Sequence, residues 1–423
     1  MEHTTEITDE RWSLAHRVGF RFFAAFVVLS TTIWYNIPFT SGWLLSSLNT
    51  AIFWLGSPLL DFFGIGEPDI STAGAGDVHA TLARTVLNLF FAALISLCWS
   101  FLDRKRASYV HLRYYLRLLV RLDLSMMMMW YGIVKVLCLQ MPAPTLATLA
   151  MPFGEQSRMQ LAWNFVGSSA TYQQFSGILE VLAGLLLLYR RTSIIGAFVA
   201  AGVLANVVMM NFCYGIPVKY YSSYLFILAL YVLSEVALPL WHMIVQRNAY
   251  ADTKAYQPQI RIWLRGAWVV IICYAVWETL GATVFASPHD PRMLRSLHPA
   301  LYGNYKVISF EVNGVPMNDV RDEQRWNQLV VGESLDSAKF DGMLRVGFDD
   351  VRPFLLQPTS DRECVMNFER PMYESYSVRI IRHDSTSAEL LARKEQLEFR
   401  LLLRKSDHQY KLEQEQFRWN FDW

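Results

Sequence analysis

The stretch that decides the fold is FSGILEVLAGLLLLYRRTSIIGAFVAAGVLANVVMMNFCYGIPVKYYSSYLFILAL, residues 175–230. Its apolar runs are separated by short polar turns, the first of which holds Arg190-Arg191. A run of about 20 apolar residues lets an α-helix cross a bilayer while it satisfies its own backbone hydrogen bonds. The stretch therefore predicts consecutive membrane-spanning helices joined by short turns.

The composition of the whole chain agrees with this interpretation. Of the 423 residues, 53% are hydrophobic and only 18% are charged, whereas an ordinary soluble protein carries about a quarter charged residues. The net charge of +1 provides no basic field for nucleic acid, so no nucleic-acid partner is expected. Membrane lipid is the expected surrounding.

The predicted fold class is an all-α polytopic membrane bundle of about seven spans, followed by a mostly β soluble domain. The expected spans are 18–40, 80–102, 118–141, 173–189, 193–213, 222–241 and 264–286. The stretch 43–64 has shorter apolar cores and is interrupted by Gly56-Ser57-Pro58. This interruption predicts an interfacial or re-entrant segment rather than a full span.

Basic residues predict the orientation of the bundle. They gather in 103–117, at Arg190-Arg191 and in 247–265, whereas 40–79 contains no Lys or Arg. Because cytoplasmic loops carry the excess of basic residues, these three segments are expected in the cytoplasm. An odd number of spans then places the C-terminal domain outside, as in a multi-pass protein of a bacterial inner (plasma) membrane.

The C-terminal part alternates in the short period of β-strands. The segment YGNYKVISFEVNGVPM (302–317) contains an Asn313-Gly314 turn of the kind that joins hairpin strands. Seven such segments predict a meander that closes into a small barrel or a sandwich. They are 302–317, 325–331, 342–348, 364–370, 376–382, 396–405 and 410–423. The opening Gly303-Asn304-Tyr305 resembles the first strand of lipocalin-like barrels.

Polar side chains recur at one depth of the expected spans. Lys135 lies about 10 Å along its helix axis from the outer end of its span, and Glu180 enters the next span to a similar depth. Since ionisable groups inside a membrane are costly, they are candidates for function. The same layer also contains Arg84, Asn88, Asn206 and Glu278.

Three interpretations of this layer remain open. Lys135 and Glu180 form a buried ion pair, with the asparagines as hydrogen bonds between helices. Alternatively, the layer lines a small cavity open to the outer face, where Lys135 and a carboxylate bind a quinone-like or anionic ligand or relay protons. In the third interpretation these side chains lie on solvated helix faces.

The sequence lacks the residue patterns that several kinds of chemistry require. No histidine falls in the hydrophobic middle of an expected span, so a membrane haem held by two histidines is not expected. No group of His, Cys and carboxylate residues has the spacing of a metal site, and the five cysteines include no Cys-x-x-Cys. The only candidate cofactor is a quinone. Cys138 and Cys213 both fall near outer helix ends, but packing is favoured over a disulfide.

The residues from about 118 to 239 resemble the DoxX/DoxD-like membrane proteins. The resemblance is carried by Tyr131-Gly132-x-x-Lys135, by QMP (140–142), by MPFG (151–154), and by the stretch 175–230 with its Asn211-Phe212-Cys213-Tyr214. It implies a four-helix core at 118–241. The chain is thus expected to comprise a cytoplasmic N-terminus (1–17), N-terminal spans (18–117), this core, a linker with the last span (242–290), and an extracytoplasmic β domain (291–423).

The same resemblance implies a limited range of functions. Some relatives look like membrane subunits of quinone-linked sulfur oxidoreductases or partners of redox proteins, and the wider clan is related to vitamin K-dependent carboxylases. We therefore expect a membrane subunit that binds a small or lipid-soluble ligand beside a redox or envelope partner. The alternatives are an enzyme that uses Lys135 and Glu180, or a scaffold whose β domain is the interaction module. The candidate ligand contacts from the matching motifs are Tyr131, Gln140, Asn211 and Tyr214.

Overall fold

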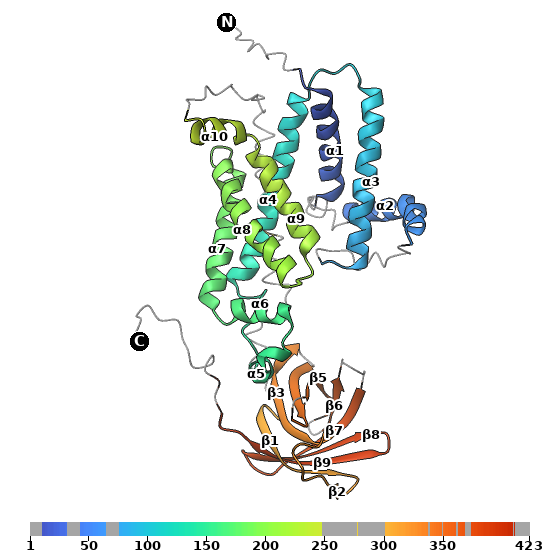
Figure 1. The fold of residues 1–423 in the computed structure, drawn as a ribbon, viewed down its shortest axis with the longest axis vertical. Helices are drawn as coiled ribbons and strands as arrows, with labels where there is room; N and C mark the ends of the chain where they lie inside the picture. The colour runs from blue at the N-terminus through green and yellow to red at the C-terminus, as the bar shows by residue number, and fades with distance from the viewer. Residues whose placement is uncertain are drawn as a thin grey trace. The chain divides into compact units, whose positions relative to one another are not determined.

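The computed structural model describes residues 11–31, 43–64, 76–247, 277, 301–336, 339–348, 350–360, 363–368, 374–408 and 410. They belong to two compact units (Figure 1). The helical unit draws on 1–136 and 175–286, and the barrel unit draws on 137–174 and 287–423. The segment 137–174, which joins two helices of the helical unit in sequence, therefore groups with the C-terminal domain.

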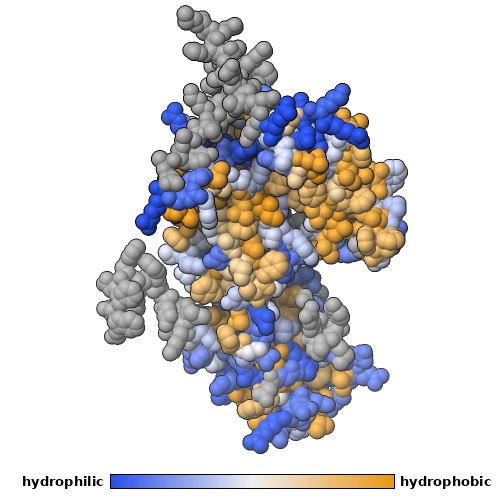
Figure 2. All heavy atoms as spheres, turned by 45° about the horizontal axis from the view of Figure 1, so that its top comes forward, coloured by the Kyte–Doolittle hydropathy of each residue, from blue (hydrophilic) through white to orange (hydrophobic). Residues whose placement is uncertain are grey.

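The helical unit is a bundle whose buried apolar residues form a larger and a smaller cluster. Its helices are α1 (Leu14–Ser30), α2 (Trp43–Phe62), α3 (His79–Leu102), α4 (Val110–Val136), α7 (Ala170–Leu188), α8 (Ser193–Cys213), α9 (Lys219–Leu233) and α10 (Ala237–Ile244). Hydrophobic residues cover much of the face of this unit that Figure 2 shows. Three helices, α3, α7 and α8, are long and apolar enough to cross a membrane. These helices are consistent with a membrane protein.

The expected number of about seven spans is not supported. The described residues supply three helices of span length and apolarity, or four if α9 and α10, which meet at a bend of 66°, make one span. The expected continuous span at 222–241 is thus broken. In the expected span 18–40, α1 ends at Ser30, because Thr31 is extended. The span expected at 264–286 lies outside the described residues.

Helix α4 departs from expectation in another way. It begins at Val110, inside the segment expected as a basic loop, and runs for 27 residues. Charged residues such as Arg117 and Arg121 lie within it, so its first turns do not have the composition of a span.

The segment expected to be interrupted at Gly56-Ser57-Pro58 is one helix, α2, with Pro58 inside it. Proline has no N–H for the carbonyl oxygen of Trp54, four residues earlier. The Ser57 hydroxyl donates to that oxygen at 3.1 Å instead, which explains why the helix continues. Figure 1 shows α2 running across α3 rather than along it, an arrangement compatible with an interfacial helix.

The barrel unit confirms the mostly β C-terminal domain and selects the barrel over the sandwich. Its strands are β1 (Gly303–Val312), β2 (Val315–Pro316), β3 (Trp326–Asp336), β4 (Lys339–Val346), β5 (Asp350–Pro358), β6 (Glu363–Phe368), β7 (Glu374–Arg382), β8 (Ser387–Lys394) and β9 (Leu397–Lys405). Strand β1 pairs with β3, each strand from β3 to β8 pairs with the one that follows it, and β1 also pairs with β9, which closes the antiparallel sheet. The short β2 only forms a hairpin with β1.

Packed side chains fill the interior of the barrel. Leu329, Met366 and Leu401 are fully buried there, and the rings of Trp326 and Phe399 stack at 5.5 Å. An eight-stranded barrel is narrow enough for side chains to fill it. The interior therefore acts as a hydrophobic core.

The rest of the barrel unit comes from the segment between α4 and α7. It contains α5 (Leu146–Ala150), a 3₁₀ turn (Phe153–Glu155) and α6 (Arg158–Gly167). Leu146 and Ala147 of α5 pack with Val330 and Met343, which form a cluster separate from the barrel core. In addition, the Thr145 hydroxyl donates to the carboxylate of Asp341. This segment thus packs on the outer face of β3 and β4 and is hydrogen-bonded to β4.

Candidate functional site

Lys135 and Glu180 form a direct ion pair between α4 and α7. Only 6% of Lys135 and 2% of Glu180 is exposed. The Lys135 ammonium donates to Oε1 of Glu180, whereas Oε2 is buried and accepts no hydrogen bond from the described residues. The structure thus brings these two residues into contact, as expected, and the ion pair uses only one of the two oxygens of the Glu180 carboxylate.

Glycines allow α4 and α7 to come this close. A Cβ atom on Gly132 would lie 2.7 Å from the carbonyl oxygen of Gly177, and one on Gly177 would lie 2.6 Å from that of Gly132. Further along the same two helices, the Ser125 hydroxyl of α4 donates to the carbonyl oxygen of Gly184 of α7 at 2.7 Å. Small residues at a helix interface permit such backbone contact in membrane bundles. The ion pair thus lies beside a tight helix crossing.

A second group of buried polar residues lies around Asp123 of α4. Asp123 is completely buried, and its carboxylate accepts a hydrogen bond of 2.9 Å from the hydroxyl of Tyr224 on α9. Arg84 of α3 is within electrostatic range of Tyr224 and Tyr221. Its Nε and one terminal nitrogen are buried and have no hydrogen-bond partner among the described residues.

Tyrosines connect the two groups. Tyr131 lies within electrostatic range of Glu180, and its ring is 6.5 Å from that of Tyr221. The ring of Tyr221 is in turn 6.2 Å from that of Tyr224. We call Arg84, Asp123, Tyr131, Lys135, Glu180, Tyr221 and Tyr224 together the polar layer. It draws on α3, α4, α7 and α9.

Sequence reasoning did not single out Asp123, although this residue lies inside the expected span 118–141. The available signal was a lone carboxylate between the apolar residues Leu122 and Leu124, since an ionisable residue in such a run is a functional candidate by default. In the structure the helix extends back from this span through the preceding arginines to Val110.

The other expected site residues lie elsewhere. Asn88 donates to the Ser30 hydroxyl at 3.2 Å, and Asn211 donates to the Ser222 hydroxyl at 2.9 Å, so both connect neighbouring helices. Asn206 and Tyr214 are exposed. Gln140 belongs to the barrel unit. Glu278 lies outside the described residues.

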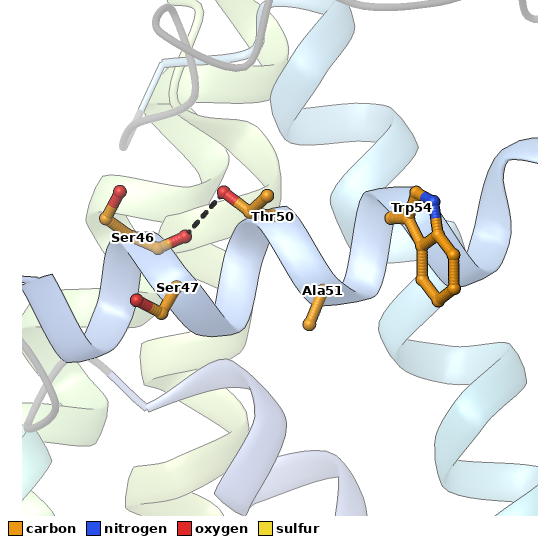
Figure 3. Close-up of a pocket in the computed structure, with 5 residues that line it drawn as sticks. All are labelled: Ser46, Ser47, Thr50, Ala51 and Trp54. Carbon is orange, nitrogen blue, oxygen red and sulfur yellow. Dashed lines mark hydrogen bonds between the residues drawn. The ribbon is translucent and has the colours of Figure 1, made fainter.

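A surface hollow of about 390 Å³ lies on α2 and is lined by Ser46, Ser47, Thr50, Ala51 and Trp54. All of these residues come from one helix, and the hydroxyl of Thr50 is used in a hydrogen bond to the carbonyl oxygen of Ser46 (Figure 3). No charged residue lines the hollow. It lacks the converging polar groups of a binding site.

The described residues contain no candidate metal centre. Nowhere in these parts of the chain do three His, Cys, Asp or Glu side chains come together in a way that would hold a metal ion. The four described cysteines, Cys98, Cys138, Cys213 and Cys364, form no disulfide with one another.

Comparison with known proteins gives one partial similarity. No family model matches the chain, and no solved structure matches it. The chain is 38% identical over 73 residues to YwoB of Bacillus subtilis (strain 168), a protein described as uncharacterized. These residues make up 17% of this chain and 47% of the relative. The chain thus spans about half the length of the curated relative that it matches.

Proposed function

We propose that the chain is a DoxX-like integral membrane protein that binds a small or lipid-soluble, quinone-like ligand in the polar layer. It would act as a membrane subunit beside a redox or envelope partner. The observation that supports this proposal is the pair of buried nitrogens on Arg84 that have no hydrogen-bond partner among the described residues. A buried donor left unsatisfied costs about 1–3 kcal/mol, and a bound acceptor would remove that cost.

The chemistry of the polar layer suits a ligand with carbonyl oxygens. The Arg84 guanidinium carries fixed N–H donors, and Tyr221 and Tyr224 lie within electrostatic range of it. A quinone offers carbonyl acceptors at the edge of a flat ring, which aromatic side chains can contact. The group around Arg84 and the tyrosines is therefore the better candidate for the ligand than Lys135, which Glu180 already occupies.

That same ion pair favours a second candidate function, a structural or assembly scaffold with the barrel unit as the interaction module. A buried pair beside a glycine contact fixes the position of two helices. The enzyme alternative, quinone-linked oxidation or carboxylase-like base chemistry, requires Lys135 or Glu180 to leave its partner first. A general base must present a free lone pair to the proton that it takes.

The experiment that tests ligand binding is quinone extraction from the full chain purified in detergent. We expect a quinone to copurify with the natural protein, and Arg84→Gln to lower the amount at least about tenfold, the loss that corresponds to about 1.4 kcal/mol. Arg104→Gln is the matched control, because Arg104 is exposed and lies over the ring of Phe101 at 4.8 Å. An unchanged quinone content in Arg84→Gln would contradict the proposal.

We also propose that 137–174 and the β domain lie on the same, outer side of the membrane. The support is the packing of α5 against β3 and β4, because two segments in contact cannot be on opposite sides of a bilayer. If α7, α8 and α9 each cross, a further crossing before β1 is needed, and the expected span 264–286 would supply it. Labelling of single cysteines placed at Thr145 and at Ser387 with a membrane-impermeant maleimide tests this: both must react from the same side.

A further inference from the structure

A row of arginines runs along the N-terminal half of α4. Arg113, Arg117 and Arg121 are spaced by four residues and so share one face of the helix. The last of them is used structurally: its Nε and a terminal nitrogen donate to the carbonyl oxygen of Leu187 at 3.0 and 2.8 Å, at the end of α7. The other two are available for a different role.

Arg117 is only partly neutralised. It pairs with Glu235 at 2.7 Å, and 16% of its side chain is exposed. Its Nε is buried and has no hydrogen-bond partner among the described residues. The hydroxyl of Tyr231 on α9, which is within electrostatic range of Arg117 and Arg113, is also buried without a partner in this part of the chain.

Positive charge is in excess here. Arg113 acts electrostatically on Arg117, and Arg190 acts on Arg121. Among the described residues, Glu235 is the one carboxylate that acts on Arg117 and Arg121, and the side chain of Arg113 has no hydrogen bond or ion pair to this part of the chain. Several like charges that share a single counterion favour a further anion.

Apolar surface lies next to this charge. Helix α10 begins two residues after Glu235, at a bend of 66° from α9, and its Leu238, Trp241 and Ile244 are between 53% and 66% exposed. Figure 1 shows α10 lying across the end of the helices rather than along them. A Trp-containing helix of this kind is typical of the membrane interface.

We propose that Arg113, Arg117 and the Tyr231 hydroxyl bind the phosphate group of an anionic phospholipid, with its acyl chains against α10. Arginine is suited to phosphate because its planar guanidinium donates two parallel hydrogen bonds. The 22 residues from Arg113 to Lys135 correspond to about 33 Å of helix, close to the thickness of the hydrocarbon core. The lipid site therefore lies at the opposite end of α4 from the Lys135–Glu180 pair, near the other membrane surface.

The test is thermal unfolding of the full chain after delipidation by detergent exchange. Phosphatidylglycerol is added in mixed micelles, and phosphatidylcholine or inorganic phosphate is added in parallel. We expect phosphatidylglycerol to raise the Tm in a concentration-dependent way, because a ligand that binds the folded state stabilises it. Phosphatidylcholine and inorganic phosphate are expected to leave the Tm unchanged.

Three variants locate the effect. Among the described residues the Arg113 side chain has no hydrogen bond or ion pair, and the Tyr231 hydroxyl has no hydrogen-bond partner. Arg113→Gln and Tyr231→Phe are therefore both expected to fold. Each should shift the half-effective phosphatidylglycerol concentration upwards at least about tenfold, while Arg104→Gln, with the same charge change, leaves it unaltered. An equal response to phosphatidylcholine, stabilisation by inorganic phosphate alone, or an equal shift in Arg104→Gln would each overturn the proposal.

Discussion

Lys135 donates its ammonium proton to Oε1 of Glu180, and this bond joins α4 to α7 inside the helical unit. Both side chains are almost inaccessible, so neither charge can be compensated by water when the other is removed. The pair therefore makes a clear prediction about single and double substitutions.

Lys135→Met and Glu180→Gln should each destabilise the protein, by about 3–5 kcal/mol where a buried charge is left alone. The double variant Lys135→Met with Glu180→Met should recover most of that loss, because no charge remains buried. The measurement is denaturant or thermal unfolding in detergent. If the double variant also retains the quinone content of the natural protein, the ion pair is structural. If the double variant folds but loses the quinone, the ion pair belongs to the ligand site.

The close approach of α4 and α7 makes a second prediction. Gly132→Ala places a Cβ atom 2.7 Å from the carbonyl oxygen of Gly177, so the helices must move apart, at an expected cost of about 1–3 kcal/mol. Gly202→Ala on α8 is the matched control, because its Cβ atom would meet nothing within 4 Å. It should be neutral or stabilising, since alanine favours a helix interior over glycine by about 1 kcal/mol. Equal unfolding temperatures for the two variants would refute this account of the interface.

The attachment of α5 to the barrel can be tested at one hydroxyl. Thr145→Val keeps the shape of the side chain but removes the hydrogen bond to the carboxylate of Asp341 and the cap that the hydroxyl gives to the N–H of Thr148. We expect faster hydrogen–deuterium exchange in 146–150, because this short helix then loses both its cap and a polar contact with β4. Thr50→Val, whose hydroxyl bonds only within α2, should leave exchange in 146–150 unchanged. Unaltered exchange in Thr145→Val would show that the bond is dispensable.

A carboxylate in the β7–β8 turn makes the stability of the barrel unit depend on pH. Asp384 accepts hydrogen bonds from the backbone and hydroxyl groups of Thr386 and Ser387, and these bonds hold the pKa of its carboxyl well below the ordinary value. Its contribution is therefore fully present above the unfolded-state pKa of about 4 and is lost as the pH falls towards the folded-state pKa.

Asp384→Asn should consequently lower the Tm at pH 7, and the difference from the natural protein should shrink below about pH 4. Thermal unfolding at a series of pH values measures this. Glu395→Gln, in the next turn, is a control with the same loss of charge and no resolved contact of this kind. A Tm difference that stays constant from pH 7 to pH 3 would contradict the prediction.

The sequence predicted local features of the barrel better than its complete strand set. The Asn313-Gly314 turn is observed with positive φ at both residues, 51° and 79°, as a two-residue hairpin requires. Strands β5 and β8 were missed. Ser387–Lys394 is rich in Ala, Glu and Leu, which favour helices, and only its pairing with β7 and β9 makes it a strand. Pro353 similarly argues against a strand in β5 when it is considered alone.

The contacts of the candidate site were likewise predictable only in part. Lys135 and Glu180 could be placed at one depth by counting residues along two helices, because helix geometry is regular. The bond between Asp123 and Tyr224 could not, since it depends on how α4 and α9 are rotated against each other. Packing of this kind is decided by side chains on several helices together. The attachment of Thr145 to Asp341, 196 residues apart, is even less visible in the sequence.

The packing of α5 against the barrel also decides whether the C-terminal domain can be separated from the rest of the protein. Val330 and Met343 are fully buried, and residues 146–147 are among those that cover them. A fragment that starts at residue 291 would carry these two side chains uncovered on its surface, which favours aggregation. The β domain therefore cannot be separated by cutting the chain before β1, because part of the surface that covers it is encoded between α4 and α7.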